Sequence, residues 1–220
     1  MRNIAIIPAR AGSKRLPDKN MLPFNGLPLF VHSILFAQKN QSIINDIVVS
    51  TDSDQIAKMA RKHGAAVVKR PPELSGDLEP TVTALEHTLK NLENTYDHVI
   101  LLQPTNPLRP QNLLKEAYKT FLEHTPENLI TVSTNHRKTG YIKDNTFVPA
   151  NYSLGQRGQD LSPEYYENGL LYIIRSEIIL QGKISGQAPF PFIVDHPYAE
   201  VDIDTEHDFK KALWYLENYP

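Results

Sequence analysis

The N-terminal stretch Ile4-Ala5-Ile6-Ile7-Pro8-Ala9-Arg10-Ala11-Gly12-Ser13-Lys14-Arg15-Leu16-Pro17-Asp18-Lys19-Asn20 decides the fold that we expect. An apolar segment suited to a buried strand runs directly into a loop that contains one glycine and the four cations Arg10, Lys14, Arg15 and Lys19. Gly12 allows the backbone to approach an anion closely and to expose its N–H groups, while the cations supply positive charge. The stretch therefore predicts a buried first strand followed by a polyphosphate-binding loop.

This basic loop matches neither of the two common phosphate-binding patterns. It lacks the second glycine and the Lys-Ser/Thr ending of a Walker loop, and it lacks the three glycines of the dinucleotide-binding pattern. A solvated basic turn is the alternative interpretation, because lysine side chains are common on protein surfaces. Four cations directly after a strand, in a chain whose formal net charge is -2, favour the anion-binding interpretation.

Strand-like and helix-like segments alternate along most of the chain, which is typical of an α/β fold with a parallel sheet between two layers of helices. Each predicted strand is short and rich in Ile, Val or Leu. The predicted strands are 3–9, 46–51, 65–69, 98–103, 129–133 and 169–174, and the predicted helices are 28–39, 53–63, 79–94, 111–124, 177–180 and 205–218. Pro28 is expected at the first position of its helix, and Thr205 is expected to cap the last helix together with Asp208.

Two segments depart from this alternation. Residues 134–166 contain Gly, Pro, Asn and several tyrosines without a helical period, which predicts a hairpin around Asp144-Asn145 and then a long irregular loop. Loops of that length in a compact domain are usually functional. Residues 181–196 combine glycine and proline with Phe190, Phe192, Ile193 and Val194, and this segment is too apolar to be a free loop.

The composition excludes several classes of protein. The 220 residues include no cysteine, which excludes a disulfide framework, a thiolate metal site and a cysteine nucleophile. The net charge of -2 argues against nonspecific nucleic-acid binding. The eight histidines show no zinc spacing, and no Gly-x-Ser-x-Gly elbow occurs. No apolar run has the length of a signal-peptide core or a membrane span, so we expect a cytoplasmic protein with no membrane partner.

Two carboxylates near the C-terminus suggest a metal site. Asp202 and Asp204 flank Ile203, and residues two apart on a strand point to the same face. Paired hard oxygens, with water and phosphate completing the shell, suit Mg²⁺. The alternative is that Asp204 caps the last helix, but capping leaves Asp202 without a role, so the pattern favours the metal site.

Five segments of the chain, in this order, resemble the cytidylyltransferases that activate sialic acid and related nonulosonic acids as CMP-sugars. They are the basic loop, Ser50-Thr51-Asp52, Arg70-Pro71-Pro72-Glu73-Leu74, Leu101-Leu102-Gln103-Pro104-Thr105-Asn106-Pro107-Leu108-Arg109 and Asp202-Ile203-Asp204-Thr205. The resemblance implies a Rossmann-like three-layer α/β/α nucleotidyltransferase fold over residues 1–220, with 134–166 as the specificity loop region. It also implies a nucleotidyltransferase that moves CMP from CTP to the anomeric hydroxyl of a 2-keto sugar acid and releases pyrophosphate.

The resemblance assigns roles to individual residues. The residues implied to bind the nucleotide are Arg10, Gly12, Ser13, Lys14, Lys19, Asn20, Arg70 and Thr81. Those implied to bind the sugar are Gln103, Arg157, Tyr172, Phe190 and Phe192. The catalytic residues are Lys19, Arg10, Asp202 and Asp204, and the two aspartates among them would bind Mg²⁺. Lys19 would neutralise the charge that builds on the leaving pyrophosphate. Gln103 ends a strand, at the edge of the sheet where open α/β folds bind ligands. Arg109 is expected only to anchor the turn after that strand, and Arg15 to be solvated.

The family also implies a homodimer, with residues 181–196 as a small protruding dimerisation element that reaches the partner's sugar site. The specificity region departs from the sialic-acid pattern, because Gly158 and Tyr166 stand where such enzymes often carry arginine. Two alternatives stay open: the same chemistry on Kdo or another acid acceptor, or a non-catalytic regulatory protein that binds nucleotide. The presence of Lys19, Asp202 and Asp204 favours an enzyme, since a binding module has little need of a metal pair.

Overall fold

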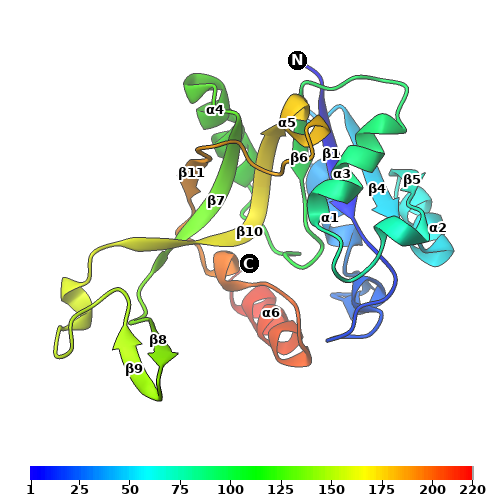
Figure 1. Cartoon of the computed structure of the whole chain (residues 1–220). Helices are drawn as coiled ribbons and strands as arrows, with labels where there is room; N and C mark the ends of the chain where they lie inside the picture. The colour runs from blue at the N-terminus through cyan, green and yellow to red at the C-terminus, as the bar shows by residue number, and fades with distance from the viewer. Residues whose placement is uncertain (220) are drawn as a thin grey trace.

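A computed structural model describes residues 1–219, and Figure 1 shows a central sheet with helices on both of its faces. The sheet has seven strands in the order β11-β7-β10-β6-β1-β4-β5. These strands are β1 (Asn3–Pro8), β4 (Asp46–Thr51), β5 (Ala66–Lys69), β6 (His98–Leu101), β7 (Asn128–Asn135), β10 (Glu164–Arg175) and β11 (Phe190–Ile193). The helices are α1 (Val31–Gln38), α2 (Asp54–Lys62), α3 (Thr81–Lys90), α4 (Leu113–His124), α5 (Ser176–Leu180) and α6 (Glu206–Asn218).

The side chains of β1 show how the layers are built. Successive residues of a strand point to opposite faces of the sheet. Ile6 packs in the apolar cluster that contains Leu85 of α3, whereas Ile7 packs in the cluster that contains Ile34 of α1. Both isoleucines are fully buried. The predicted three-layer α/β/α arrangement is therefore confirmed, with β1 in its middle layer.

The sheet is mixed rather than parallel throughout. Strands β6, β1, β4 and β5 pair in parallel, as predicted, but β10 runs antiparallel to both β6 and β7. A parallel neighbour needs a crossover connection that returns the chain to the starting edge of the sheet. The segment between β7 and β10 contains no such helix, so the chain enters β10 at the edge where β7 ends. The prediction of a wholly parallel sheet is wrong for this strand.

The chain between β1 and α1 contains an element that the sequence did not reveal. Strands β2 (Pro23–Phe24) and β3 (Leu27–Pro28) form a small hairpin, and Asn25 and Gly26 have positive φ at its turn. Pro28 therefore belongs to a strand, and α1 begins at Val31. The prediction of Pro28 as the first residue of the helix is wrong.

The hairpin predicted around Asp144-Asn145 is confirmed. Strands β8 (Gly140–Lys143) and β9 (Thr146–Pro149) pair antiparallel, and Asp144 and Asn145 have φ values of 47° and 58° in the turn between them. Such a turn matches the natural twist of a two-stranded hairpin. Figure 1 shows that this hairpin projects from the body of the molecule.

The prediction that residues 181–196 protrude is wrong. Residues Phe190–Ile193 form β11, which pairs in parallel with β7 at the edge of the central sheet. The rings of Phe190 and His124 stack with their centroids 4.5 Å apart, and Phe190 and Phe192 both pack against the main apolar cluster. An edge strand that packs on a helix and a surface that docks on a partner both need apolar residues. Composition alone therefore could not distinguish an edge strand from a dimerisation element. No described helix is long and apolar enough to cross a membrane.

Helix α6 lies at the end of the sheet from which the loops of the site emerge (Figure 1). Its first turn has the predicted capping box, in which Thr205 accepts a hydrogen bond from the backbone of Asp208 and the Asp208 side chain accepts one from Thr205. The helix packs in a separate apolar cluster with the β2–β3 hairpin and the segment before it, through Phe24, Ile203 and Ala212. This packing brings the carboxylates of residues 202–204 to the basic loop.

Candidate active site

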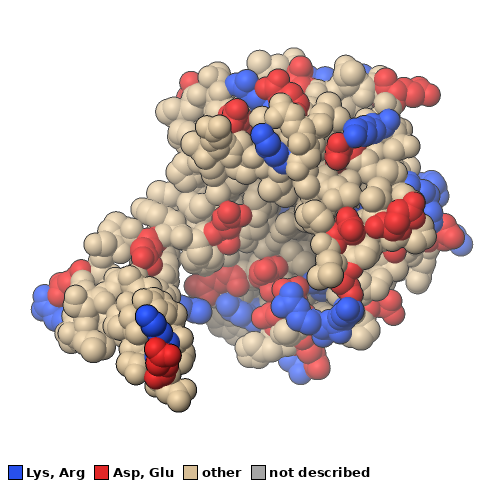
Figure 2. All heavy atoms as spheres, viewed as in Figure 1, with Lys and Arg blue, Asp and Glu red and all other residues tan. Residues whose placement is uncertain are grey.

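A cleft of about 350 Å³ lies at the carboxyl ends of the parallel strands, where open α/β sheets bind ligands. Its walls come from the loops that follow β1, β5 and β6 and from the segment before α6. The lining residues are Pro8, Arg10, Ser13, Lys19, Asn20, Arg70, Gly76, Asp77, Glu79, Thr81, Gln103, Pro104, Thr105, Asp202 and Asp204. Figure 2 shows basic and acidic side chains gathered side by side around a hollow in the molecule.

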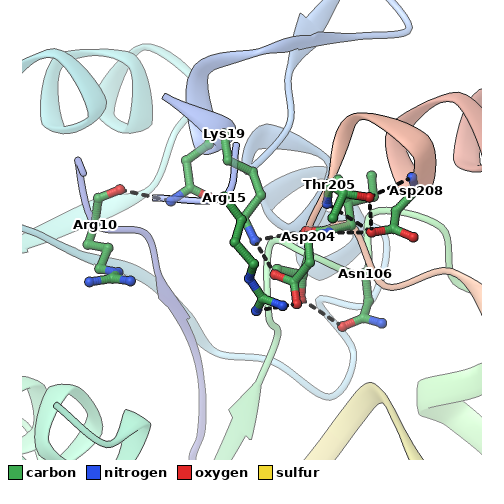
Figure 3. Close-up of polar contacts among 10 residues, drawn as sticks. Arg10, Arg15, Lys19, Asn106, Asp204, Thr205 and Asp208 are labelled. Atoms are coloured by element: carbon green, nitrogen blue, oxygen red, sulfur yellow. Dashed lines mark hydrogen bonds and ion pairs between the residues drawn. The ribbon is translucent and has the colours of Figure 1, made fainter. Parts of the chain in front are cut away.

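Most of the residues predicted to bind nucleotide line this cleft. Gly12 and Lys14 belong to the same loop but do not line it, and Lys14 instead reaches the side chain of Asp77. Asn20 fixes the shape of the loop, because its Nδ2 donates a hydrogen bond of 2.9 Å to the carbonyl of Arg10 (Figure 3). The structure thus brings the predicted nucleotide-binding residues into one region.

Lys19 is the most deeply placed cation of the loop. It follows Asp18, which has a left-handed backbone with φ of 50°, and only 8% of Lys19 is exposed. Its Nζ donates hydrogen bonds of 2.8 Å to the carbonyl of Ile203 and to Oδ1 of Asp204. Arg15 donates to the other oxygen of Asp204 at 2.6 Å (Figure 3), so this side chain is largely exposed, as expected, but also forms an ion pair.

The segment that carries Asp202 and Asp204 is extended but is not a strand of the sheet. Val201 and Ile203 are buried, and the two carboxylates alternate with them and line the cleft, so they share one side as predicted. A hydrogen bond from the amide of Ile203 to the carbonyl of Thr105, 2.9 Å long, holds the segment in place.

The surroundings of the Asp202 carboxyl group disfavour its ionised form. Shielding from water raises the pKa of Asp202, and the negative charge of Asp204 adds to this rise. A hydrogen bond from Thr105 and the positive charge of Lys19 oppose it. A cation bound nearby would relieve this penalty.

The donor set fits Mg²⁺ only if the nucleotide supplies further ligands. Within residues 1–219, no group of three or more His, Cys, Asp or Glu side chains could hold a metal ion. Mg²⁺ is commonly bound by one or two carboxylates together with substrate phosphates and water. Asp202 and Asp204 meet that requirement, although both oxygens of Asp204 are engaged by Arg15 and Lys19.

Arg70 lines the cleft and carries a buried donor without a partner among the described residues. The residue is 8% exposed, its Nη2 lies 3.5 Å from the carbonyl of Ser50, and its buried Nε has no partner. Burial lowers the pKa of Arg70, whereas the negative charge of Asp52 opposes this. A buried donor without a partner is costly in a folded protein. Arg70 is therefore suited to bind a polar group of a ligand, and Thr81, at the start of α3, lines the same wall.

Two buried side chains hold the loop after β6 in shape. Arg109 donates hydrogen bonds to the carbonyls of Gln103 and Leu170 at 2.8 and 2.7 Å, and burial lowers its pKa to about 9. The expected anchoring role of Arg109 is confirmed. Asn106 donates to the carbonyls of Asn168 and Val201 at 3.0 and 2.7 Å. Sequence reasoning gave Asn106 no role, because nothing in the sequence identifies acceptors so far away along the chain.

Asp77 is a second residue that sequence reasoning missed. Its carboxylate forms ion pairs with Arg10 and Lys14, 2.6 and 2.7 Å long. Hydrogen bonds from Lys14 and Arg10 hold the pKa of Asp77 below its usual range. Asp77 follows Gly76 in a loop of ordinary composition, so no local signal connects it with the basic loop.

A second cavity, of about 530 Å³, meets the cleft at Asp202. It is lined by Thr134, Asn135, His136, Arg137, Thr139, Tyr166, Glu167, Asn168, Ala199, Glu200, Asp202 and Lys211. Most of these residues follow β7 or belong to β10 and to the segment before α6. The cavity therefore offers both cations and carboxylates to a polar ligand beside the cleft.

The predicted sugar-binding residues are dispersed within the chain. Gln103 lines the cleft, and the hydroxyl of Tyr172 donates to Glu167, which lines the second cavity, at 3.2 Å. Arg157 pairs with Asp160 in the projecting segment, 2.8 Å apart. Phe190 and Phe192 lie at the edge of the sheet, against the core of their own chain. A single chain thus does not bring this set together.

Comparison with known proteins assigns the family. A family model described as cytidylyltransferase matches residues 4–218. The chain is similar to the N-acylneuraminate cytidylyltransferase of Streptococcus agalactiae, with 35% identity over 231 aligned residues that cover 98% of this chain and 54% of the relative. It is also similar to the pseudaminic acid cytidylyltransferase of Campylobacter jejuni, with 34% identity over 227 residues and 97% of each chain covered. The chain spans about half the length of the Streptococcus relative.

A solved structure supports the fold. The structure of CMP-2-keto-3-deoxy-manno-octonic acid synthetase complexed with CTP matches the whole of both chains with a TM-score of 0.74 and 15% identity. Since that identity is low, this similarity concerns the fold alone. The family model covers nearly all of the chain, and the two relatives reach 34% and 35% identity. The chain belongs to the cytidylyltransferase family.

Proposed function

We propose that this protein transfers CMP from CTP to the anomeric hydroxyl of a 2-keto sugar acid of the nonulosonic class. The observation that carries the proposal is the pair of adjoining cavities, of about 350 and 530 Å³, that share Asp202. A nucleotide in the first cavity would place its α-phosphate near the junction, where an acceptor in the second cavity can reach it. The relatives named above act on N-acylneuraminic and pseudaminic acid, as their names state.

The cleft supplies complementary groups along the length of CTP. The guanidinium group of Arg70 would donate to the base, and Thr81 also lines the cleft. Arg10, Ser13 and Lys14, with the amide groups around Gly12, would hold the phosphates. Side chains that the fold already holds in the cleft would lower the entropy lost on binding.

The reaction breaks the bond between the α-phosphorus and its bridging oxygen and forms a bond between that phosphorus and the anomeric oxygen. Pyrophosphate leaves with the bridging oxygen. Lys19, held at the junction by Ile203 and Asp204, would neutralise the negative charge that accumulates there. The acceptor hydroxyl loses its proton in the same reaction, and no histidine stands among the described residues that line the cleft.

Asp202 and Asp204 are the residues that would hold Mg²⁺. When bound, the ion would supply charge neutralisation for the phosphates. Asp202 would face it directly, while Asp204 would have to exchange contacts with Arg15 or Lys19 before its oxygens could participate.

The acceptor cavity does not favour one sugar acid over another of the same class. Arg137 and Lys211 can meet a carboxylate, and Glu167 and Glu200 can accept hydrogen bonds from hydroxyl or amide groups. Tyr166, which stands where sialic-acid enzymes often carry arginine, is part of its wall. Kdo, 2-keto-3-deoxy-manno-octonic acid, remains the second candidate acceptor, because the structural neighbour complexed with CTP is the synthetase of its CMP derivative.

A pyrophosphate-release assay tests the proposal. We expect release with CTP and Mg²⁺ together with at least one 2-keto sugar acid, and far slower release with ATP, GTP or UTP. Failure of every nonulosonic acid and of Kdo, with CTP binding intact, would leave the alternative of a non-catalytic nucleotide-binding protein. Failure to bind CTP at all would contradict the assignment of the cleft.

We also propose that the protein is a homodimer assembled through the β8–β9 hairpin rather than through residues 181–196. Tyr141, Ile142 and Phe147 of this hairpin are 56%, 71% and 46% exposed. A lone two-stranded hairpin is only marginally stable in water, and a projecting apolar one gains stability from a partner. Location in the cytoplasm stays a prediction.

A further inference from the structure

Every cation of the basic loop is neutralised in the structure by a carboxylate from a distant part of the chain. Arg15 and Lys19 pair with Asp204, the candidate metal ligand. Arg10 and Lys14 pair with Asp77, which the proposed reaction does not use. The two pairs of cations are thus held by two carboxylates in the region where we place the triphosphate.

Asp77 engages its cations as a phosphate group would. One carboxylate oxygen lies 2.6 Å from Nη1 of Arg10, and the other lies 2.7 Å from Nζ of Lys14. Two oxygens on one central atom, each facing a separate cation, reproduce the contacts that a terminal phosphate makes in such a loop. Asp77 also lines the cleft, so it lies where a ligand would displace it.

The loop that carries Asp77 is well suited to move. Leu78, the next residue, is 97% exposed, and Gly76 precedes Asp77. The side chain of Asp77 is itself 30% exposed, and its ion pairs provide the contacts that fix it. A loop with few buried apolar contacts opens at low cost.

We propose that Asp77 is an internal competitor for the cations that bind the terminal phosphates of the nucleotide. In the free protein it keeps Arg10 and Lys14 in position, a bound triphosphate displaces it, and its return favours the release of pyrophosphate. The inference rests on the proposed function, because it takes the basic loop to be the triphosphate site.

Competition by Asp77 leaves CTP and pyrophosphate with different affinities for the cleft. The cost of displacing Asp77 enters the binding of every ligand that uses Arg10 and Lys14. CTP offsets this cost through its base and ribose, for which the cleft offers Arg70 and Thr81. Pyrophosphate has no such contacts, so the same cost leaves it weakly bound. Asp77 would thus help the product to leave without preventing the substrate from binding.

Calorimetric titration with inorganic pyrophosphate, without Mg²⁺, tests the proposal directly. In the Asp77→Asn variant the cations are free, and we expect pyrophosphate to bind about three- to tenfold more tightly than to the wild type, in line with solvent-accessible ion pairs. Because these pairs are screened by salt, the difference should shrink at high ionic strength. Glu73→Gln is the matched control, since Glu73 is an exposed carboxylate of the same loop region that lines neither cavity, and it should change nothing.

Unchanged or weaker binding of pyrophosphate to Asp77→Asn would overturn the proposal. Weaker binding that appears only when Mg²⁺ is added would instead make Asp77 a metal ligand. Asp77→Ser serves as a second variant that also removes the charge, and thermal unfolding checks that both variants are folded. The titration uses neither CTP nor a sugar acid, so a protein that fails to transfer CMP would defeat the proposed function while the titration still decides the role of Asp77.

Discussion

Asp202 and Asp204 differ in their surroundings although they are only two residues apart. Asp204 is paired with two cations, whereas Asp202 carries a raised pKa at the junction of the two cavities. We expect Asp202→Asn to lower CTP-dependent pyrophosphate release by more than about 100-fold, because the variant loses a charge that a bound cation requires. Circular dichroism should show an intact fold.

Glu206→Gln is the control for this measurement. Glu206 is an exposed carboxylate of the adjacent helix that pairs with Lys210, 2.8 Å away. It should retain wild-type turnover. If Asp202→Asn stayed within a few fold of the wild type, the assignment of the metal site would be wrong.

Lys19 and Arg15 contact the same carboxylate, which allows their roles to be compared. The Lys19 side chain is 11% exposed and that of Arg15 is 70% exposed. We expect Lys19→Ala to reduce kcat by about 100-fold or more with a smaller change in KM, since its contact strengthens as pyrophosphate departs. Arg15→Ala should cost far less, because solvent screens its charge. An effect of Lys19→Ala confined to KM would reduce this residue to a role in binding.

At the residue scale, the sequence revealed the parts of the site that are contiguous. The basic loop, Arg70 and the two aspartates could be predicted because each lies in a compact motif. Asp77 and Asn106 could not, because their partners lie far along the chain and only the fold brings them together. The same limit applies to Arg15, whose partner Asp204 lies 189 residues away.

Among the elements, β10 contains an irregularity that positions the site. Its register shifts between Glu167 and Tyr172, and Gly169 has φ of 73° there. A Cβ at Gly169 would lie 2.9 Å from Oδ1 of Asn106 and 3.2 Å from Oε1 of Gln103. We expect Gly169→Ala to lower the free energy of unfolding by about 1 to 3 kcal/mol, through backbone strain and this close contact.

Urea denaturation measures this effect, and Gly155→Ala separates its two causes. Gly155 also has positive φ, 86°, but a Cβ there would have no neighbour within 4 Å. Its substitution should therefore cost less, since it carries the backbone strain alone. Equal losses in the two variants would show that the contact with Asn106 is unimportant.

The β8–β9 hairpin is the element on which the proposed dimer depends. Replacing Tyr141 and Ile142 with serine removes exposed apolar surface without touching the core of the protomer. We expect the wild type to sediment as a dimer at micromolar concentration and the double variant as a monomer. Leu180→Ser, at a residue of α5 that is 48% exposed, should remain a dimer. A monomeric wild type, or a dimeric double variant, would contradict the proposal.

Elements with a strong local pattern could be predicted from the sequence, and elements defined by their neighbours could not. The alternation of apolar strands and amphipathic helices predicted six of the seven strands of the large sheet, all except β11, and the positions of the helices. The direction of β10 depends on the path of the preceding loop, and the place of β11 depends on an open edge beside β7. The residues of these strands alone therefore determine neither the direction of β10 nor the position of β11.

For the molecule as a whole, the buried histidine His98 limits stability in acid. His98 is 7% exposed, its Nδ1 lies 3.0 Å from Oδ1 of Asn3, and burial lowers its pKa. The unfolded chain therefore takes up a proton on His98 at a higher pH than the folded protein does. The contribution of His98 to the free energy of unfolding should be complete above about pH 6.5 and should decline as the pH falls below that value.

Thermal unfolding between pH 5 and 8 checks this expectation. His98→Asn should show a flatter decline, because asparagine has no proton to gain. His63→Asn, at the C-cap of α2, is the control substitution of a histidine. A wild-type profile that is flat through this range would contradict the prediction.

The contacts of Lys19 also govern when the site can exist during synthesis. Its ammonium group bonds to residues 184 and 185 positions further along the chain. A ribosome that has released the basic loop must therefore synthesise the chain as far as Asp204 before Lys19 gains its counter-charge, and contacts so distant in sequence form slowly. A chain that terminates before residue 202 would carry a basic loop but no complete cleft. Nucleotide binding would thus distinguish chains that extend past Asp204 from shorter ones.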